Sequence, residues 1–460
     1  MTRKSFIGGV FSAGAAPAIV PNTVLGENAP SSRVTVGGVG IGGVGHRQLQ
    51  EIKKAGFEVV ALCDVDDVHA KKTYDKFPQA RRYRDFRELL RAEGDKVDAV
   101  YCGTPDHTHA IVTLAALAAR KHVCCVKPLT RSVEECRVVV DAARRAGVAT
   151  QVTASAWTED GNMRAMEYVE AGVLGDVTEV HCWSIRPVWP QGMPAYPDFT
   201  DKVPSTLDWD LWLGPAEKRP FAARWPKGSP IPSLPKENWI GDAVYHPFNF
   251  RGWFEFGAGA LGDMGCHRAN AVFKVLGLTY PERIEASMTR VSPVAFPLAS
   301  LVTYDFPRRG SKPPVRLNWY DGGLLPAKPK EMGDEPLPVE GVMYVGTKGK
   351  MLVTFVKGIS QPPRILDEAL AKKHADMPQI FPRRAGGIYG EWLEACKGGE
   401  KASCNFEWAQ YITEFVQLGN LAVRTGSPVV FDAKAMKVTN NPAADALLRI
   451  PYHNGWKLGV

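Results

Sequence analysis

A glycine-rich loop between an apolar run and an amphipathic helix constrains the fold of this chain more than any other feature. Residues 34–39 are largely apolar, residues 40–45 follow the spacing G-x-G-x-x-G, and a helical pattern follows with Leu49 and Ile52 on one face. Such glycines allow a tight turn and let a pyrophosphate approach the backbone amides at the start of a helix. The spacing predicts a dinucleotide site, with cofactor contacts from Gly40, Ile41, Gly42 and Gly45.

An acidic residue follows the second strand of this unit. Residues 57–63 form another apolar run, and Asp64 comes next, about twenty residues beyond the glycines. A carboxylate at this place can accept hydrogen bonds from the adenosine ribose. Asp66 and Asp67 follow with no Arg or Lys before Lys71. A ribose 2′-phosphate would therefore meet only negative charge, and the pattern favours NAD over NADP.

Strands and helices continue to alternate as far as about residue 152. Residues 97–102, 122–126 and 148–152 are strand-like, whereas residues 110–119 and 133–146 are helical. Alternation with short loops predicts an α/β fold whose first domain is a doubly wound, parallel Rossmann sheet. Ligands of such sheets bind at the carboxyl ends of the strands.

Two further segments should therefore lie beside the glycine loop. The first contains Thr104, Pro105 and His109, and the second begins with Lys127 directly after a strand. A lysine ammonium there could stabilise a developing alkoxide. Asp106 lies in the first of these segments, but its carboxylate could simply cap the helix that begins near it and take no part in the site.

The second half of the chain is patterned differently. Residues 177–186 and several runs between residues 283 and 355 alternate apolar and polar side chains, which predicts an α+β domain with a large, mostly antiparallel sheet. A segment rich in tryptophan and proline, residues 183–253, should pack over the ligand cleft, where aromatic faces could stack on a sugar. The candidates for substrate contact are Trp157, Arg186, Trp189 and Tyr320. The expected domains are residues 1–30 as a leader or flexible tail, 31–154 as the cofactor domain, and 155–460 as the second domain with a tail that packs on the first.

The N-terminus has the pattern of an export signal. Arg3 and Lys4 precede a stretch of small and apolar residues that ends near Ala16-Pro17-Ala18. The segment is similar to a twin-arginine signal in which Lys4 replaces the second arginine, so it predicts a periplasmic or exported protein, with a cytoplasmic one as the alternative. No later window is apolar enough for a membrane span. The net charge of +7 comes without a basic run, which argues against nucleic-acid binding.

The chain resembles the Gfo/Idh/MocA family, which includes glucose–fructose oxidoreductase and inositol dehydrogenase. The resemblance rests on the glycine loop, on Thr104-Pro105 with His109, on Lys127-Pro128-Leu129 and on the run from Gly262 to His267, and it extends over about residues 33–458. Residues 341–349 and the tail from Ala402 to Trp456 look similar to a secreted bacterial branch of the family. Relatives usually carry a glutamate before the lysine, and here Val126 takes its place.

The resemblance implies the roles of the site residues. Thr104, Pro105, His109 and Lys127 would contact the cofactor, and Lys127, Asp263 and His267 would be catalytic, with His267 as the proton acceptor. The spacing of Asp263 and His267 puts both on one face of a helix, where a carboxylate can raise the basicity of an imidazole. The same spacing also suits a capping aspartate and a surface histidine. His107, His109 and His122 lack a clustered fourth ligand, so no metal is expected.

Three functions are compatible with these residues. The first is an NAD-dependent oxidoreductase that acts on a CH–OH group of a sugar, polyol or glycoside. The second is a redox-neutral, glycoside-cleaving enzyme with tightly bound NAD, because an exported protein has no pool of NAD to exchange with. The third is a sugar-binding protein without activity, suggested by Val126. A carbohydrate is the expected small-molecule partner, and a dimer or tetramer formed through the second sheet is the expected assembly.

The acidic run after the second strand leads to a prediction about the cofactor. NAD should bind at least about tenfold more tightly than NADP, because repulsion of a 2′-phosphate should cost more than about 1.4 kcal/mol. Titration of both cofactors measures the ratio, and Asp64→Ala should narrow it. Equal affinities for the two cofactors would contradict the prediction.

Overall fold

The computed structural model describes residues 33–232, 241–290 and 292–459. The predicted leader, residues 1–30, lies outside the described residues. Within the described ranges, no helix combines the length and apolar character that a membrane crossing requires.

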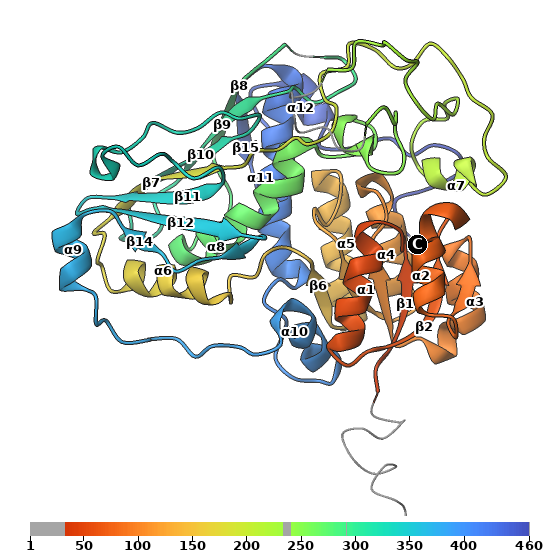
Figure 1. Cartoon of the computed structure of the whole chain (residues 1–460), viewed down its shortest axis with the longest axis horizontal. Coiled ribbons are helices and arrows are strands. Elements are labelled where there is room, and N and C mark those ends of the chain that lie inside the picture. The colour runs from red at the N-terminus through yellow and green to blue at the C-terminus, as the bar shows by residue number, and fades with distance from the viewer. Residues whose placement is uncertain (1–32, 233–240, 291, 460) are drawn as a thin grey trace, which may run out of the picture. The chain divides into compact units, whose positions relative to one another are not determined.

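The first sheet is parallel throughout and has six strands (Figure 1). In spatial order they are β3 (Arg81–Tyr83), β2 (Glu58–Cys63), β1 (Thr35–Val39), β4 (Ala99–Cys102), β5 (His122–Cys125) and β6 (Thr150–Val152). The connecting helices are α1 (Val44–Lys54), α2 (Asp67–Lys76), α3 (Phe86–Glu93), α4 (His109–Ala118) and α5 (Val133–Ala146). The order confirms the predicted Rossmann sheet, and its switch point lies between β1 and β4, where such sheets bind their ligands.

Helix α5 shows how the local sequence sets an element of this domain. The hydroxyl of Ser132 accepts a hydrogen bond from the backbone of Glu135, and the Glu135 carboxylate accepts one from the backbone of Ser132. This reciprocal capping satisfies two amides that the first turn leaves unpaired. At the other end, Gly147 adopts a left-handed conformation and closes the helix.

The second sheet is large, mixed and mostly antiparallel, as predicted, with β7 and β10 as a parallel pair. Its strands are β7 (Val177–Trp183), β8 (Arg283–Met288), β9 (Ser300–Phe306), β10 (Val315–Tyr320), β11 (Gly341–Gly346), β12 (Lys350–Val356), β13 (Ile359–Ser360), β14 (Arg364–Ile365), β15 (Val429–Asp432) and β16 (Lys437–Val438). The helices of this half are α6 (Asp160–Glu170), α7 (Trp209–Leu213), α8 (Cys266–Leu276), α9 (Glu368–Lys373), α10 (Gly387–Cys396), α11 (Phe406–Thr425) and α12 (Pro442–Ala446).

Helix α11 connects the two sheets. It packs on α5 of the first domain and on α8 and β8 of the second, and its apolar residues belong to a core cluster that includes both (Figure 1). Arg137 of α5 forms a bidentate ion pair with Glu414 of α11. Near the C-terminus, Trp456 stacks on Phe86 of α3. The segments that carry the site therefore share one continuous core.

The tryptophan-rich insertion forms a small core of its own. Trp209, Trp212 and Trp253 are buried in a cluster with neighbouring phenylalanine and tyrosine rings. The insertion also pairs with the chain after β2, since the backbone N–H of Asp67 donates to the carbonyl of Thr206. Most of these tryptophans thus pack against one another.

A buried tyrosine without a hydrogen-bond partner gives a prediction about stability. The hydroxyl of Tyr304 on β9 is fully buried and has no partner among the described residues, so Tyr304→Phe should leave stability unchanged or raise it by up to about 1 kcal/mol. Tyr101→Phe on β4 is the matched control, because the Tyr101 hydroxyl donates to Gln48 at 2.7 Å and its loss should cost about 1 kcal/mol. Urea unfolding measures both, and a larger loss at Tyr304 than at Tyr101 would contradict the prediction.

Candidate active site

The glycine loop after β1 has no room for side chains at two positions. Gly40 has a φ of 72°, and a Cβ there would lie 2.5 Å from the backbone nitrogen of Thr104. A Cβ at Gly42 would lie 2.0 Å from the ring of His69. The missing side chains bring the loop against the segment after β4, as a dinucleotide site requires.

The N-terminus of α1 is free of side-chain caps. The helix begins at Val44 after Gly43, no side chain caps it, and its first turn contains no acidic residue. The positive dipole end of this helix and the backbone N–H groups of its first turn therefore suit a pyrophosphate. Together with the two close approaches in the loop, this fits the predicted NAD site.

Asp64 has partners within the protein that the sequence did not predict. Its carboxylate accepts hydrogen bonds from the backbone N–H groups of Ile41 and Gly42, at 2.9 and 3.1 Å. It thus fixes the glycine loop in place. Its contact with the ribose remains a prediction.

The other two acids of the run are paired as well. Asp66 lies 2.9 Å from His246 and Asp67 forms an ion pair with Arg84. Burial raises the pKa of Asp66, but hydrogen bonds from His246 and from the backbone outweigh it and leave that pKa below its ordinary value. The sequence places no Arg or Lys directly beside these acids, but the fold brings Arg84 against Asp67 and His246 against Asp66.

His109 joins the two loops at the carboxyl edge of the sheet. Its ring is fully buried, with Nδ1 2.8 Å from the carbonyl oxygen of Pro128 and Nε2 2.8 Å from that of Thr104. Both nitrogens are engaged by the backbone, so neither is free to bind a ligand. The predicted direct cofactor contact is replaced by a positioning role: His109 holds Thr104 and Pro105 beside the loop that carries Lys127.

Asp263 lies at the centre of a cluster of cations. Its Oδ1 pairs with Nζ of Lys127 and lies 3.4 Å from Nε of Arg251, while Oδ2 lies 3.8 Å from Nε of Arg186. The side chains of Lys127 and Asp263 are only 15% and 13% exposed. Burial raises the pKa of Asp263, but Lys127 and then Arg251 outweigh it, so the pKa lies far below its usual range. Asp263 is therefore a stable carboxylate that orients Lys127.

His267 does not pair with Asp263 as the spacing predicts. Residues Leu261–Gly265 form a π-helical turn before α8, so the α-helical i, i+4 alignment does not apply there. Instead, Nδ1 of His267 accepts a hydrogen bond from the backbone N–H of Ser155 at 2.9 Å. Burial, followed by the charge of Lys127, lowers the pKa of His267 to about 3. The ring is neutral with its proton on Nε2, which makes it a hydrogen-bond donor and a poor base.

Asp106 belongs to the same cluster and does not cap a helix. The first turn Asp106–Thr108 and helix α4 both begin without a side-chain cap. Burial raises the pKa of the Asp106 carboxyl above its ordinary value, although His109, Arg251 and Lys127 act in the opposite direction. Burial therefore makes the Asp106 carboxylate easier to protonate than an ordinary aspartate, whereas the cations around Asp263 make that carboxylate harder to protonate.

Two of the predicted substrate contacts are engaged within the protein, Trp189 as a buried side chain and Trp157 as a partly buried one. Trp189 is 1% exposed, and its Nε1–H donates to Gln191. Trp157 donates to the carbonyl oxygen of Ser403, and Nζ of Lys274 lies 4.5 Å from its ring centre. The structure thus gives Trp189 a packing role, because its own insertion covers the ring.

Tyr320 lies on the wrong side of the second sheet for substrate contact. Side chains alternate between the two faces along β7 and β10, and Cys182 and Trp319 belong to the core that contains α8. The hydroxyl of Tyr320 instead lies 3.0 Å from Nδ1 of His181. Tyr320 therefore faces away from Asp263. Among the four candidates for substrate contact, Arg186 lies in the cluster around Asp263.

Arg251 and Ser155 are site residues that the sequence did not reveal. Arg251 lies in the short turn Asn249–Gly252 within the insertion, and Ser155 lies in a loop after β6. Neither belongs to a motif with a recognisable spacing. Only their contacts with Asp263 and His267 identify them.

The parallel sheet, the glycine loop and the polar cluster at its carboxyl edge define a dinucleotide-binding α/β protein. Residues 34–154 match the model of the Gfo/Idh/MocA family, described as an oxidoreductase family with an NAD-binding Rossmann fold.

Curated relatives are similar to part of the chain. Inositol 2-dehydrogenase of Salmonella paratyphi B is 31% identical over 147 residues, which is 31% of this chain and 43% of that protein. Inositol 2-dehydrogenase of Rubrobacter xylanophilus is 37% identical over 114 residues, which is 24% of this chain and 32% of that protein. Each match spans less than half the length of the relative.

Solved structures share the fold over most of the chain. The WlbA dehydrogenase of Bordetella pertussis, crystallised with NADH and UDP-GlcNAcA, is 15% identical with a TM-score of 0.59 and covers 87% of this chain and 99% of its own. Aldose-aldose oxidoreductase of Caulobacter crescentus, crystallised with glycerol, is 17% identical with a TM-score of 0.55. The match covers 87% of this chain and 100% of that protein. These likenesses extend the fold assignment to the second domain.

The contacts of His109 lead to a prediction that separates positioning from packing. His109→Ala should remove the hydrogen bond that the buried imidazole donates to one of the carbonyl groups of Thr104 and Pro128 and cost about 1–3 kcal/mol of unfolding free energy. NAD affinity should fall as well, because Thr104 borders the glycine loop. His122→Ala is the control, since His122 is half-buried and accepts a single backbone hydrogen bond at 2.9 Å. Equal stability and equal NAD affinity in the two variants would contradict the positioning role.

Proposed function

We propose that this protein is an NAD-dependent oxidoreductase that acts on a CH–OH group of a sugar or polyol. The observation that carries the proposal is the ion pair of Lys127 and Asp263, held with Arg251 and Arg186 at the carboxyl edge of the Rossmann sheet. The bound nicotinamide accepts or returns a hydride at its reactive carbon. The protein's own residues must therefore bind the hydroxyl group and handle its proton.

Lys127 binds the reacting oxygen in this proposal. Its ammonium group has three N–H donors, and one of them is directed to Asp263. The other two are available to a substrate oxygen. The positive charge in a largely buried site stabilises the alkoxide that forms as the carbinol loses its proton.

Asp106 is the proton acceptor in this scheme, and His267 is a donor. The pKa of Asp106 is raised above that of an ordinary aspartate, whereas strong cations lower that of Asp263. His267 keeps Nδ1 on the backbone of Ser155, so its Nε2–H can bind a substrate oxygen but cannot remove a proton. This assignment replaces the expected role of His267 as the base.

A polyhydroxylated substrate suits the groups in the cluster. Lys127, Arg186 and Arg251 supply donors in several directions, and the inositol 2-dehydrogenases are named for a cyclic polyol. These observations support a sugar or polyol without specifying which one. Export to the periplasm remains part of the proposal and rests on the sequence of residues 2–18 alone.

Single-turnover hydride transfer, followed as nicotinamide absorbance with a panel of sugars and polyols, tests the assignment. Lys127→Met and Asp106→Asn should each reduce the rate constant by about 10²–10⁴-fold. The double variant should be little slower than the slower single variant, because the two groups act as one unit. The rate of the parent should fall as the pH drops through a pKa above that of an ordinary aspartate, and Asp106→Asn should lose this acidic limb.

His267→Gln is the matched comparison, since an amide can keep both an acceptor and a donor in place. It should lose clearly less activity than Asp106→Asn. If His267→Gln instead removed the acidic limb while Asp106→Asn kept it, His267 would be the base. Absence of hydride transfer with every sugar, together with tight sugar binding, would favour a binding protein.

A further inference from the structure

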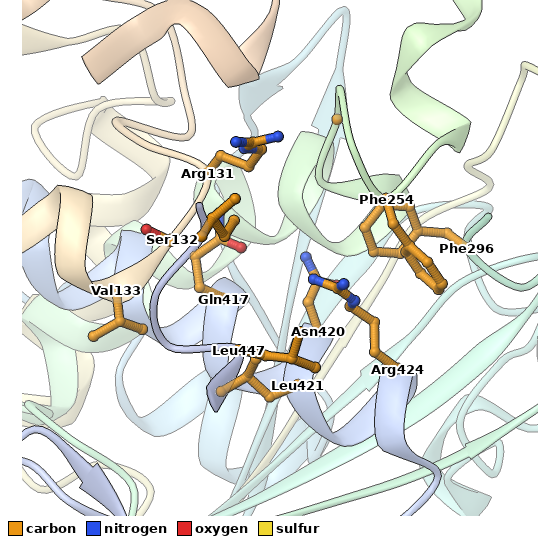
Figure 2. Close-up of a pocket in the computed structure, with 12 residues that line it drawn as sticks. Arg131, Ser132, Val133, Phe254, Phe296, Gln417, Asn420, Leu421, Arg424 and Leu447 are labelled. Carbon is orange, nitrogen blue, oxygen red and sulfur yellow. The ribbon is translucent and has the colours of Figure 1, made fainter. Parts of the chain in front are cut away.

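A small cavity behind the site is bordered by two arginines that have no acidic partner. It lies between the loop before α5, the last turns of α11 and the loop that contains Phe254 (Figure 2). Arg131 comes from the first of these segments and Arg424 from the second. Both guanidinium groups are separate from the Lys127–Asp263 cluster.

Arg131 is the more deeply buried of the two. Its side chain is 5% exposed, and Nε and Nη2 have no hydrogen-bond partner among the described residues. Only Nη1 is engaged, as a donor to the carbonyl oxygen of Glu255. A buried cation with two unsatisfied donors is costly unless a group outside the protein compensates it.

Arg424 adds a second positive charge to the same cavity. It forms no ion pair among the described residues, and its guanidinium lies 4.8 Å from the ring centre of Phe254. Burial and then the charge of Arg131 lower its pKa to about 10, so it remains a cation at neutral pH. Two like charges close together in a buried site favour an anion between them.

The carboxylates of the neighbouring acids, Glu135 and Glu255, have other partners. Glu135 accepts the backbone N–H groups of Arg131 and Ser132 and the hydroxyl of Tyr452. The carboxylate of Glu255 pairs with Arg219. Neither carboxylate forms an ion pair with Arg131 or Arg424.

The remaining polar groups of the cavity are amides of α11. Gln417 donates to the carbonyl oxygen of Thr130, and Asn420 donates to that of Ala258, so each amide retains a second hydrogen. The aromatic rings of Phe254 and Phe296 form the opposite wall (Figure 2). The lining thus offers donors and apolar surface.

The size of the cavity limits its occupant. The volume is about 10 Å³, close to that needed for one water-sized sphere. A halide is only slightly larger than water and therefore needs less space than a tetrahedral oxyanion such as phosphate. We propose that this cavity is a halide site, occupied by chloride, in which Arg131 and Arg424 bind the ion from two segments of the chain.

The ion would connect the parts of the chain that carry the active site. Arg131 follows Lys127 by four residues, and Phe254 and Gly257 precede Asp263 in the sequence. A bound chloride would therefore fix both loops to the end of α11. The inference does not depend on the proposed reaction.

Crystals of the full chain grown in sodium bromide test the site directly. A peak in the anomalous difference map between the guanidinium groups of Arg131 and Arg424 is the expected result. A water molecule without anomalous signal at that place would overturn the proposal.

Thermal unfolding tests the same site in solution. At constant ionic strength, replacing sodium gluconate by sodium chloride should raise the midpoint temperature by about 1–2 °C with saturation. Arg424→Gln should abolish the saturable rise in midpoint temperature that chloride causes. Arg309→Gln is the control, because Arg309 is another partly buried arginine with only carbonyl partners and should keep the response.

Two results would overturn the assignment of a chloride site. A chloride response that persists in Arg424→Gln would overturn the assignment, as would a saturable response to phosphate that exceeds the response to chloride. If Arg424→Gln fails to fold, Arg424→Lys replaces it and should weaken the chloride response while keeping the charge.

Discussion

The ion pair between Lys127 and Asp263 is the interaction on which the site depends. Lys127 follows a strand of the Rossmann sheet, whereas Asp263 lies in a π-helical turn of the second domain, so the pair forms only when the two domains share one core. Helix α11 provides that core by packing on both. The charge of the lysine lowers the pKa of Asp263, and it adds to burial, the larger cause, in lowering the pKa of His267.

The loops around this pair are held by backbone hydrogen bonds more than by contacts between side chains. His109 joins two carbonyl groups, Asp64 binds two amides of the glycine loop, and Ser155 directs the tautomer of His267 through its backbone N–H. Each is a buried polar group whose partner is fixed by the chain. Such contacts pre-organise a site before a ligand binds, because the loops do not need to rearrange.

Sequence patterns predicted the scaffold well and the roles of side chains less well. The glycine spacing and the alternation of strands and helices led to the Rossmann sheet, and Lys127 and Asp263 do meet. Arg251, in contrast, has no motif. The base role of His267 came from the family resemblance, and its expected pairing with Asp263 assumed an α-helix. Trp189 and Tyr320 were expected near the substrate, but burial within the insertion and the alternation of faces along β10 place them elsewhere.

What the sequence alone determined is therefore local: the glycine loop, the alternation of strands and helices expected of a Rossmann unit, and the residue types at the strand ends. These depend on backbone sterics and on periodicities of two and 3.6 residues, which can be read along the chain. Tertiary structure alone decided which acids are paired, which histidine nitrogen carries a proton and which arginines remain without a carboxylate. Those properties depend on burial and on charges from segments far apart in the sequence, and no local pattern encodes a distance between such segments.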